Sequence, residues 1–331
     1  MSAQPVPPAR RARLWRTAAA VAVLLGVAAY LLVQYVNSGP GAPRCTVRVQ
    51  GGGDPYELTP EQAANAATIS AVAASRGLPE RAVTIALATA MQESGLRNID
   101  FGDRDSVGLF QQRPSQDWGT VKQIMDPVYS SGEFYRHLVK VPGYSRLPLT
   151  VAAQRVQRSG YPQAYAKHEA NAALLTGALT GRSGDALSCT VSHPVDGAGP
   201  DGAAKVREKL VREFGAAVLP RTAATGGTDA AADRSVTVPV RPDGVAAAAP
   251  GEAGQRGWQL ANWALAHAAD LHIERISYAG RTWTAADSDE GWQRPAAGDA
   301  AGAGQTAGTG DAAGTGDSGD SGDAVRIVTA R

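Results

Sequence analysis

The stretch AMQESGLRNIDFGDRDSVGLFQQRP, residues 90–114, decides the fold prediction for the central part of this chain. Apolar residues leading into it recur at i, i+4, i+7 and i+8 from Val83, a spacing that predicts a buried helix over residues 79–94. Gly95 is expected to end that helix, so Glu93 lies in its last turn. Free carbonyl groups and the negative end of the helix dipole disfavour a negative charge there, and partial burial acts the same way. We therefore expect Glu93 to hold a proton.

A carboxyl group that holds its proton is suited to general acid catalysis on a glycosidic bond, where it protonates the leaving oxygen. Nearby side chains could complete such a site. The amides of Gln111 and Gln112 can hydrogen-bond sugar hydroxyls, and the rings that could stack on a sugar are those of Phe110, Trp118 and Tyr161. The alternative is that Glu93 is a solvated residue at a helix end, since charged residues rarely stay buried unpaired.

The surrounding sequence predicts more helices. Residues 59–62, Thr-Pro-Glu-Gln, have the pattern of a capping box that starts a helix ending near Arg76. Three further helices are expected, from Asp126–Pro127, from Thr150 and from Pro162, the last with Tyr165, Ala172 and Leu175 on its inner side. No strong strand pattern occurs between Thr59 and Gly181. We predict a mainly α domain over residues 55–189.

The N-terminal region has the pattern of a membrane anchor. Four arginines precede an uncharged apolar run at residues 17–36, which is about long enough to span a bilayer as a helix. The arginines predict that residues 1–16 are cytoplasmic and that the bulk of this single-pass chain is extracytoplasmic. A cleaved secretory signal is the alternative. Residues 37–54, rich in glycine and proline, are predicted to be a spacer.

The two cysteines, Cys45 and Cys189, fall on the outward side of this anchor, where oxidising conditions permit a disulfide. They bracket the helical region. Two free thiols are the alternative.

The rest of the chain shows weaker patterns. Residues 190–254 are predicted to be a linker that holds a short helix around Val206–Phe214 and a strand near residue 235. Residues 255–331 are predicted to form a small α/β domain, with an amphipathic helix from about Gly257 and strands at 273–278, 281–284 and 325–329. Its tract of alanine, glycine and aspartate at residues 296–323 is predicted to be a disordered insertion.

Charge and motifs exclude several classes of function. The net charge of +1, without a basic stripe interleaved with aromatics, gives no general attraction to nucleic acid. The sequence holds no phosphate loop, no Gly-x-Ser-x-Gly elbow and no Cys/His metal spacing, and its five histidines are scattered. We predict no nucleic-acid partner, no metal and no cofactor.

Three stretches resemble the superfamily of soluble lytic transglycosylases and goose-type lysozymes. They are GLPERAVTIALATAMQESGL (77–96), DSVGLFQQRP (105–114) and DPVYSSGEFYRHLVKV (126–141). The family signature is a helix that ends in Glu-Ser, a loop, and then Gly-Leu-Met/Phe-Gln. The resemblance covers about residues 59–180 and implies a lysozyme-like fold of the transglycosylase type. It also implies a glycosidase that cleaves the β-1,4 bond between N-acetylmuramic acid and N-acetylglucosamine in peptidoglycan strands.

The resemblance assigns roles by position. Glu93 matches the single glutamate that acts first as acid and then as base, and Ser94 matches its neighbouring serine. Gly108, Leu109, Phe110 and Gln111 match the turn that lines the family's substrate cleft. From their side chains and their place in this sequence, Gln112, Gln157 and Tyr161 are expected to bind substrate as well. Goose-type relatives are helped by aspartates in this loop, where the chain has Asp100, Asp103 and Asp105. Attack by water and attack by the muramyl 6-hydroxyl both stay open.

The chain departs from the family late in the helical domain. The stretch AAQRVQRSGYPQAY, residues 152–165, replaces the family's Ala-Tyr-Asn-Ala-Gly, so Gln157, Arg158 and Ser159 would form that wall. The alternative to an enzyme is a non-catalytic module on the same fold that binds peptidoglycan or assembles the cell wall. The C-terminal region faintly resembles a small domain of actinobacterial cell-wall proteins, but it lacks the histidine pattern of related domains. This implies a structural role or a cell-wall protein partner.

Overall fold

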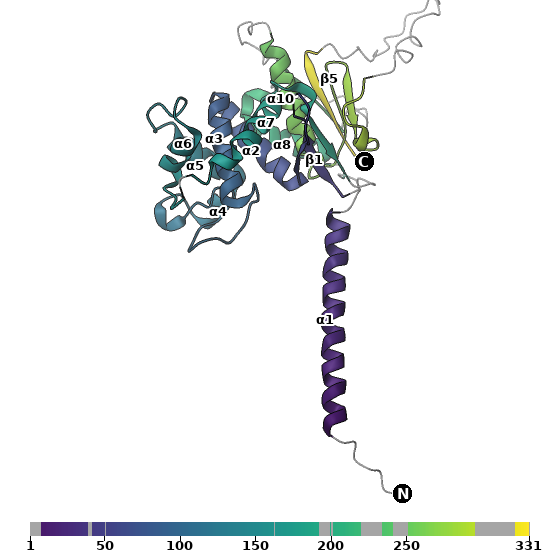
Figure 1. The fold of residues 1–331 in the computed structure, drawn as a ribbon. Coiled ribbons are helices and arrows are strands. Elements are labelled where there is room, and N and C mark those ends of the chain that lie inside the picture. Colours follow the sequence, from purple (N-terminus) through teal and green to yellow (C-terminus); the bar gives the residue numbers. More distant parts are fainter. Residues whose placement is uncertain are drawn as a thin grey trace, which may run out of the picture. The chain divides into compact units, whose positions relative to one another are not determined.

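A computed structural model of the chain describes residues 8–38, 42–49, 51–161, 163–191, 199, 201–219, 234–240, 251–294 and 322–330. Helices dominate the described residues, and two small antiparallel sheets accompany them (Figure 1). The chain divides into two compact units, Met1–Ala42 and Pro43–Arg331.

The first unit is a single helix, α1 (Pro8–Ser38), which contains the apolar run at residues 17–36. Within the part of the chain that the structure describes, no helix combines the length and the apolar character needed to cross a membrane. The predicted anchor stays a prediction.

The second unit begins its helical part with the two helices that the sequence predicted best. In front of α2 (Pro60–Ser75), the hydroxyl of Thr59 accepts a hydrogen bond from the Gln62 amide at 3.3 Å, and the Gln62 side chain accepts one from the Thr59 amide at 2.8 Å. This is the predicted capping box. α3 (Glu80–Ser94) ends at Gly95, whose φ of 64° lies in the left-handed region that favours glycine.

The remaining helices of this part are α4 (Val121–Ile124), α5 (Pro127–Leu138), α6 (Leu149–Gln157) and α7 (Glu169–Leu179). α5 follows Asp126, whose carboxylate accepts a hydrogen bond from the Val128 amide at 3.0 Å, as a helix cap does. The predicted start of the last helix at Pro162 is wrong. That residue lies outside the described ones, and a 3-10 turn precedes α7, so Tyr165 comes before the helix.

A three-stranded antiparallel sheet, in the order β2-β1-β3, joins the two ends of the helical part. Its strands are β1 (Arg44–Val47), β2 (Tyr56–Leu58) and β3 (Leu187–Thr190). Cys45 and Cys189 lie opposite each other in the β1–β3 ladder and form the predicted disulfide. The predicted spacer at 37–54 is therefore wrong in part, because it contains β1. Two inward side chains, Cys45 and Val47, make too short a pattern to reveal a strand.

The C-terminal part contains the elements α8 (Gly202–Phe214), β4 (Ser235–Pro239), α10 (Glu252–Ala266), β5 (Ile273–Tyr278), β6 (Arg281–Thr284) and β7 (Ala324–Thr329). The four strands pair antiparallel in the order β4-β7-β5-β6. The predicted helices and strands of this part are confirmed. The insertion predicted at 296–323 lies outside the described residues up to residue 321.

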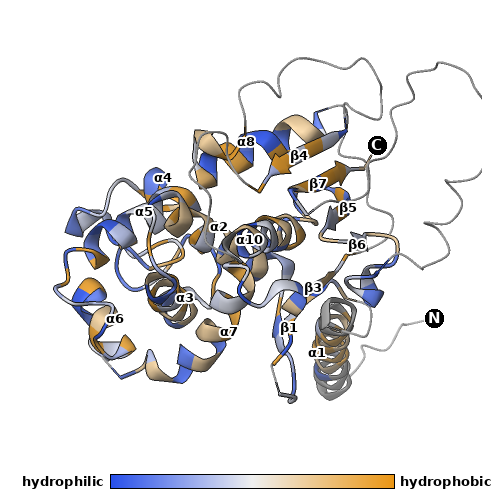
Figure 2. Ribbon diagram, turned by 90° about the horizontal axis from the view of Figure 1, so that it is seen from above, coloured by the Kyte–Doolittle hydropathy of each residue, from blue (hydrophilic) through white to orange (hydrophobic). Residues whose placement is uncertain are grey.

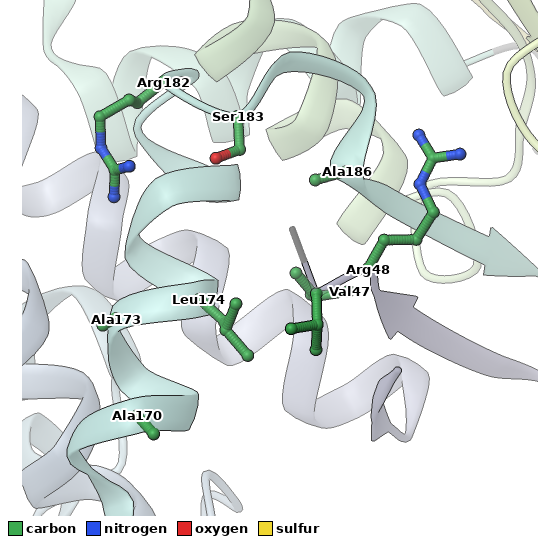
Figure 3. Close-up of a pocket in the computed structure, with 9 residues that line it drawn as sticks. Val47, Arg48, Ala170, Ala173, Leu174, Arg182, Ser183 and Ala186 are labelled. Atoms are coloured by element: carbon green, nitrogen blue, oxygen red, sulfur yellow. The ribbon is translucent and has the colours of Figure 1, made fainter. Parts of the chain in front are cut away.

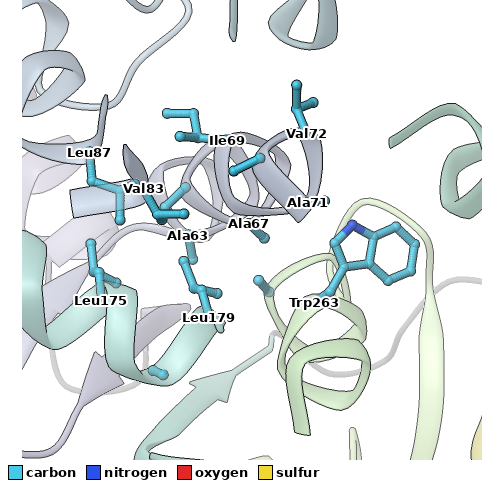
Figure 4. Packing of buried hydrophobic residues seen from close by; sticks show 14 of the residues in the cluster. Ala63, Ala67, Ile69, Ala71, Val72, Val83, Leu87, Leu175, Leu179 and Trp263 are labelled. Atoms are coloured by element: carbon cyan, nitrogen blue, oxygen red, sulfur yellow. The ribbon is translucent and has the colours of Figure 1, made fainter. Parts of the chain in front are cut away.

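One hydrophobic cluster runs through the whole second unit. α10 contacts α2 and α7 on one side and β5 and β7 on the other, and it lies between the helices and the sheet (Figure 2). Figure 4 shows Trp263 of α10 beside the alanine-rich face of α2. Small side chains on α2 allow its neighbours to approach closely. The predicted boundaries at 189/190 and 254/255 therefore do not coincide with a break in the core.

Candidate active site around Glu93

Glu93 is half-buried in the last turn of α3. One of its carboxyl oxygens, Oε1, accepts a hydrogen bond of 2.7 Å from the hydroxyl of Tyr165. Burial raises the pKa of Glu93, while hydrogen bonds from Tyr165 and Gln157 oppose that rise without cancelling it. The direction of the shift is the one that the sequence predicted, and its main cause is desolvation.

Tyr165 is the residue of this site that sequence reasoning missed. Its side chain is fully buried, and both burial and the nearby charge of Glu93 raise the pKa of its hydroxyl. The hydroxyl therefore keeps its proton and acts as the donor to Glu93. A signal was present, because Tyr165 is the last residue of the stretch 152–165 that replaces the family's Tyr-Asn pair. The sequence alone placed it only on the inner side of a helix.

The turn at residues 107–112 is held closed by its backbone. The amides of Val107 and Gln112 each donate to the other residue's carbonyl at 3.0 Å. Gly108 has a φ of 78°, and a Cβ atom added to it would lie 2.8 Å from the carbonyl oxygen of Ile124. Only glycine fits this position without a shift of the backbone.

Two side chains tie this turn to the elements around Glu93. The hydroxyl of Ser94 donates to the carbonyl of Leu109 at 2.8 Å, and the side-chain amide of Gln157 donates to the carbonyl of Phe110 at 2.8 Å. The end of α3, the turn and the end of α6 therefore form one frame. Ser94 was predicted to bind substrate, but its bond to Leu109 makes it a positioning residue for the turn.

Three predicted substrate contacts belong instead to the core. The side chains of Leu109 and Phe110 are fully buried, and the Phe110 ring stacks on Phe134 with centroids 4.7 Å apart. Gln112 is buried as well, and its amide donates to the carbonyl of Ser130 at 3.0 Å. A ligand at the surface does not reach these side chains. Burying the large apolar ring of Phe110 outweighs any benefit of presenting it to a sugar.

Other predicted contacts lie nearer the surface. Gln111 is half-buried, and its side-chain amide donates at 3.3 Å to the carbonyls of Phe101 and Gly108, within its own loop. Tyr161 is 80% exposed. Trp118 is half-buried, and its ring stacks on that of His137 with centroids 4.2 Å apart.

The three candidate aspartates differ in their surroundings. Asp105 accepts hydrogen bonds of 2.8 Å from the Arg113 side chain and from the Ser115 amide, and these bonds hold the pKa of Asp105 well below its usual range. Its carboxylate orders the loop. Asp100 and Asp103 are exposed. Within the described residues, no group of His, Cys, Asp and Glu is arranged to hold a metal ion.

Two cavities of the second unit lie away from Glu93. One, of about 240 Å³, opens between α7 and β1, where Leu174 and Val47 face each other (Figure 3). The arginines at its edges, Arg48 and Arg182, form ion pairs with Asp185 and Glu80. The other cavity lies beside α10, and Glu93 lines neither of them.

Comparison with known proteins gives a partial match. Residues 200–305 match a family model described as the C-terminal domain of VldE. The match covers less than half of the chain and includes α8, α10 and the strands β4, β5 and β6, but not Glu93. No curated protein matches the chain.

Proposed function

We propose that this protein is a peptidoglycan glycosidase, a lytic transglycosylase or muramidase, in which Glu93 is the general acid. One observation carries the proposal: a half-buried carboxyl group with a raised pKa is held by a buried tyrosine hydroxyl, beside a rigid turn of the family-like Gly-Leu-Phe-Gln sequence. Raised carboxyl pKa values suit general acids that work near neutral pH.

The hydrogen bond from Tyr165 gives the two carboxyl oxygens of Glu93 different roles. Oε1 accepts from the tyrosine hydroxyl, which leaves the other oxygen to carry the proton. In the proposed reaction this proton passes to the glycosidic oxygen as the bond between N-acetylmuramic acid and N-acetylglucosamine breaks. The resulting carboxylate then takes a proton from the attacking group, either water or the muramyl 6-hydroxyl. The Tyr165 hydrogen bond strengthens when Glu93 becomes charged, so it stabilises that intermediate state.

The proposed location is outside the cytoplasm. The Cys45–Cys189 disulfide supports it, because disulfides persist in oxidising compartments. We further propose that the chain is held at the cell membrane by residues 17–36, and that the C-terminal part serves a structural role or binds a cell-wall protein.

A second candidate function is a module on the same frame that binds peptidoglycan without cutting it. The departure at residues 152–165 favours this function, since the family's Tyr-Asn pair is missing there beside Glu93.

The test is mass spectrometry of muropeptides released from purified peptidoglycan by the full-length chain. Glu93→Gln removes the proton that is transferred, and we expect it to lower release by about 100- to 10,000-fold. Glu57→Gln is the matched control, because Glu57 is exposed on β2. Anhydromuramyl products would identify a transglycosylase and reducing-end products a muramidase. Absence of release by the unaltered chain, with binding to peptidoglycan retained, would favour the binding module.

A further inference from the structure

The cavity beside α10 combines a cation with apolar walls. It has a volume of about 240 Å³ and lies where α10 meets the ends of α2 and α7 and the start of α3. Its polar lining includes Arg256, Gln259 and Glu80, and its apolar lining is Ala74, Leu78 and Val83. None of these residues belongs to the frame around Glu93.

Among the described residues, the guanidinium group of Arg256 has few partners for its charge. It donates one hydrogen bond, of 2.5 Å, to the side-chain oxygen of Gln259, and it lies 4.7 Å from the centroid of the Phe214 ring. None of the ion pairs formed by the described residues includes it. A guanidinium has five N–H donors, so most of its capacity is left for a ligand. Burial lowers the pKa of Arg256 to about 10, which leaves it charged at neutral pH.

The second charged residue of the cavity is already engaged. Glu80 accepts hydrogen bonds from Thr180 at 2.9 Å and from the Gln255 amide at 3.2 Å, and it pairs with Arg182 at 3.0 Å. Glu80 therefore does not neutralise Arg256. Its negative charge disfavours a doubly charged anion in the same cavity more than a singly charged one.

The walls of the cavity are formed before any ligand arrives. A Cβ atom added to Gly181 would lie 1.9 Å from the carbonyl oxygen of Gln255, so the end of α7 touches α10 directly. Gly257 is packed as closely against the ring of Tyr278 on its other side. α10 is thus held on both faces, and Arg256 is presented from a fixed element, as in sites that are largely pre-formed.

We propose that this cavity binds a small organic monocarboxylate that carries a short apolar group, such as the C-terminal end of a short peptide. The carboxylate would pair with Arg256, whose planar fork matches the two oxygens. The short apolar group would lie against Ala74, Leu78 and Val83. The side-chain amide nitrogen of Gln259 donates no hydrogen bond to the described residues and could donate to the ligand.

Calorimetric titration of the full-length chain with N-acetyl-alanyl-alanine tests the ligand class. The C-terminal amide of the same dipeptide is the control, since it differs only in lacking the charge. We expect the acid to bind and the amide to bind at least roughly tenfold more weakly. Equal binding of the two, no binding of the acid, or tighter binding of inorganic phosphate would overturn the proposal.

Variants test the site itself. Arg256→Gln is expected to weaken binding of the dipeptide by roughly 10- to 100-fold, whereas Arg155→Gln, at an exposed arginine of α6, should leave it unchanged. Ala74→Leu fills the cavity and leaves the guanidinium in place, so it should also weaken binding. Circular dichroism checks that each variant folds. Retained binding in both Arg256→Gln and Ala74→Leu would place the ligand elsewhere.

The inference is independent of the proposed glycosidase. Glu93→Gln should bind the dipeptide as the unaltered chain does, and Arg256→Gln should leave the release of muropeptides unchanged. If the unaltered chain releases muropeptides but does not bind the dipeptide, this inference alone fails; if it binds the dipeptide but releases no muropeptides, the proposed glycosidase alone fails.

Discussion

Glu93 and Glu213 are both removed from water to some extent, but their neighbours leave their pKa values shifted in opposite directions. Glu93 is half-buried at the end of α3 and is hydrogen-bonded by Tyr165 and Gln157, both of which are neutral. Glu213 is 1% exposed near the end of α8, and its neighbours include cations. Burial raises the pKa of Glu93. The same effect acts on Glu213, but there nearby positive charge reverses it and lowers the pKa to about 2.

The partners of Glu213 explain the reversal. Its Oε1 lies 3.1 Å from the ammonium of Lys209, and its Oε2 accepts a hydrogen bond of 2.7 Å from the indole of Trp263. The Nε2 atom of His267 lies 3.7 Å from Oε2, while its Nδ1 atom lies 3.1 Å from Asp270. Burial would lower the pKa of His267, but the two carboxylates raise it overall. The two carboxylates therefore favour the charged form of His267, which in turn favours the charged form of Glu213.

The difference shows that burial alone does not decide whether a carboxyl group holds its proton. Neutral donors stabilise the carboxylate less than cations do, so desolvation wins at Glu93 and charge wins at Glu213. The first arrangement leaves a proton that can be transferred. The second binds α8, α10 and α2 together, because Thr68 of α2 also donates to Glu213 at 3.0 Å.

The same substitution at the two positions should separate these roles. Glu213→Gln leaves the buried His267 and the half-buried Lys209 with only the more exposed Asp270 as a counter-charge, and we expect a loss of about 3 to 5 kcal/mol in the free energy of unfolding. Glu93→Gln keeps an oxygen that accepts from Tyr165 and replaces a protonated carboxyl group by a neutral amide of the same shape, so its effect should stay within about 1 kcal/mol. Urea-induced unfolding followed by circular dichroism measures both. Equal losses of unfolding free energy in the two variants would contradict the different roles assigned to Glu213 and Glu93.

Lowering the pH should change the stability contributions of the two carboxyl groups in opposite directions. The pKa of Glu213 falls from 4.5 to about 2 on folding, so its contribution is fully present above about pH 4.5 and is lost as the pH falls towards 2. The raised pKa of Glu93 acts in reverse, because the folded state holds that proton more tightly and loses stability as the pH rises through the folded pKa.

Thermal unfolding midpoints measured from about pH 2 to about pH 6 test these signs. We expect the midpoint of the unaltered chain to fall towards pH 2, and Glu213→Gln to flatten that fall. Glu93→Gln should show the same fall of the midpoint as the unaltered chain. A profile of Glu213→Gln that still falls as steeply as that of the unaltered chain would show that other groups cause the acid limb.

The sequence predicted the first carboxyl group and not the second, for a physical reason. Glu93 is marked by local features: the apolar spacing of α3, the stop at Gly95 and the Gly-Leu-Phe-Gln turn. The partners of Glu213 include Thr68, Trp263 and His267, which come from two other helices far away in the sequence. No short stretch carries that arrangement, so α8 was predicted only as a short helix in a linker.

The same dependence on partners that are distant in the sequence explains the other differences between the predictions and the structure. Helix starts and stops were predicted well, because the capping box at residues 59–62 and the glycine at 95 act over a few residues. β1 was missed because it is short and its pairing depends on β3, which lies at the far end of the helical part. Tyr165 was missed as a partner of Glu93 because the two are 72 positions apart. Phe110 was expected at a ligand because nothing local shows that Phe134 covers it.

The smallest expected effect tests the neutral partner that sets Glu93 apart from Glu213. Tyr165→Phe removes the hydrogen bond that opposes the rise in the pKa of Glu93, so that pKa should rise further. The loss of one buried hydrogen bond should cost about 1 kcal/mol of stability. Tyr135→Phe is the matched control, because the Tyr135 hydroxyl is also buried and donates at 3.0 Å to the carbonyl of Ile69. It should cost as much and leave the pKa of Glu93 unchanged.

Titration of the side-chain carboxyl carbon of Glu93 by nuclear magnetic resonance reads out the pKa in each variant. A rise in Tyr165→Phe alone assigns the hydrogen bond to the carboxylate form, the form that exists after the proton has left. The upper pH limit of muropeptide release should then move upwards in the same variant, since the acid stays protonated to a higher pH, while the rate at its optimum falls because the carboxylate is less stabilised. An unchanged or lowered pKa in Tyr165→Phe would mean that the hydroxyl does not stabilise that charge, and the contrast with Glu213 would rest on burial alone.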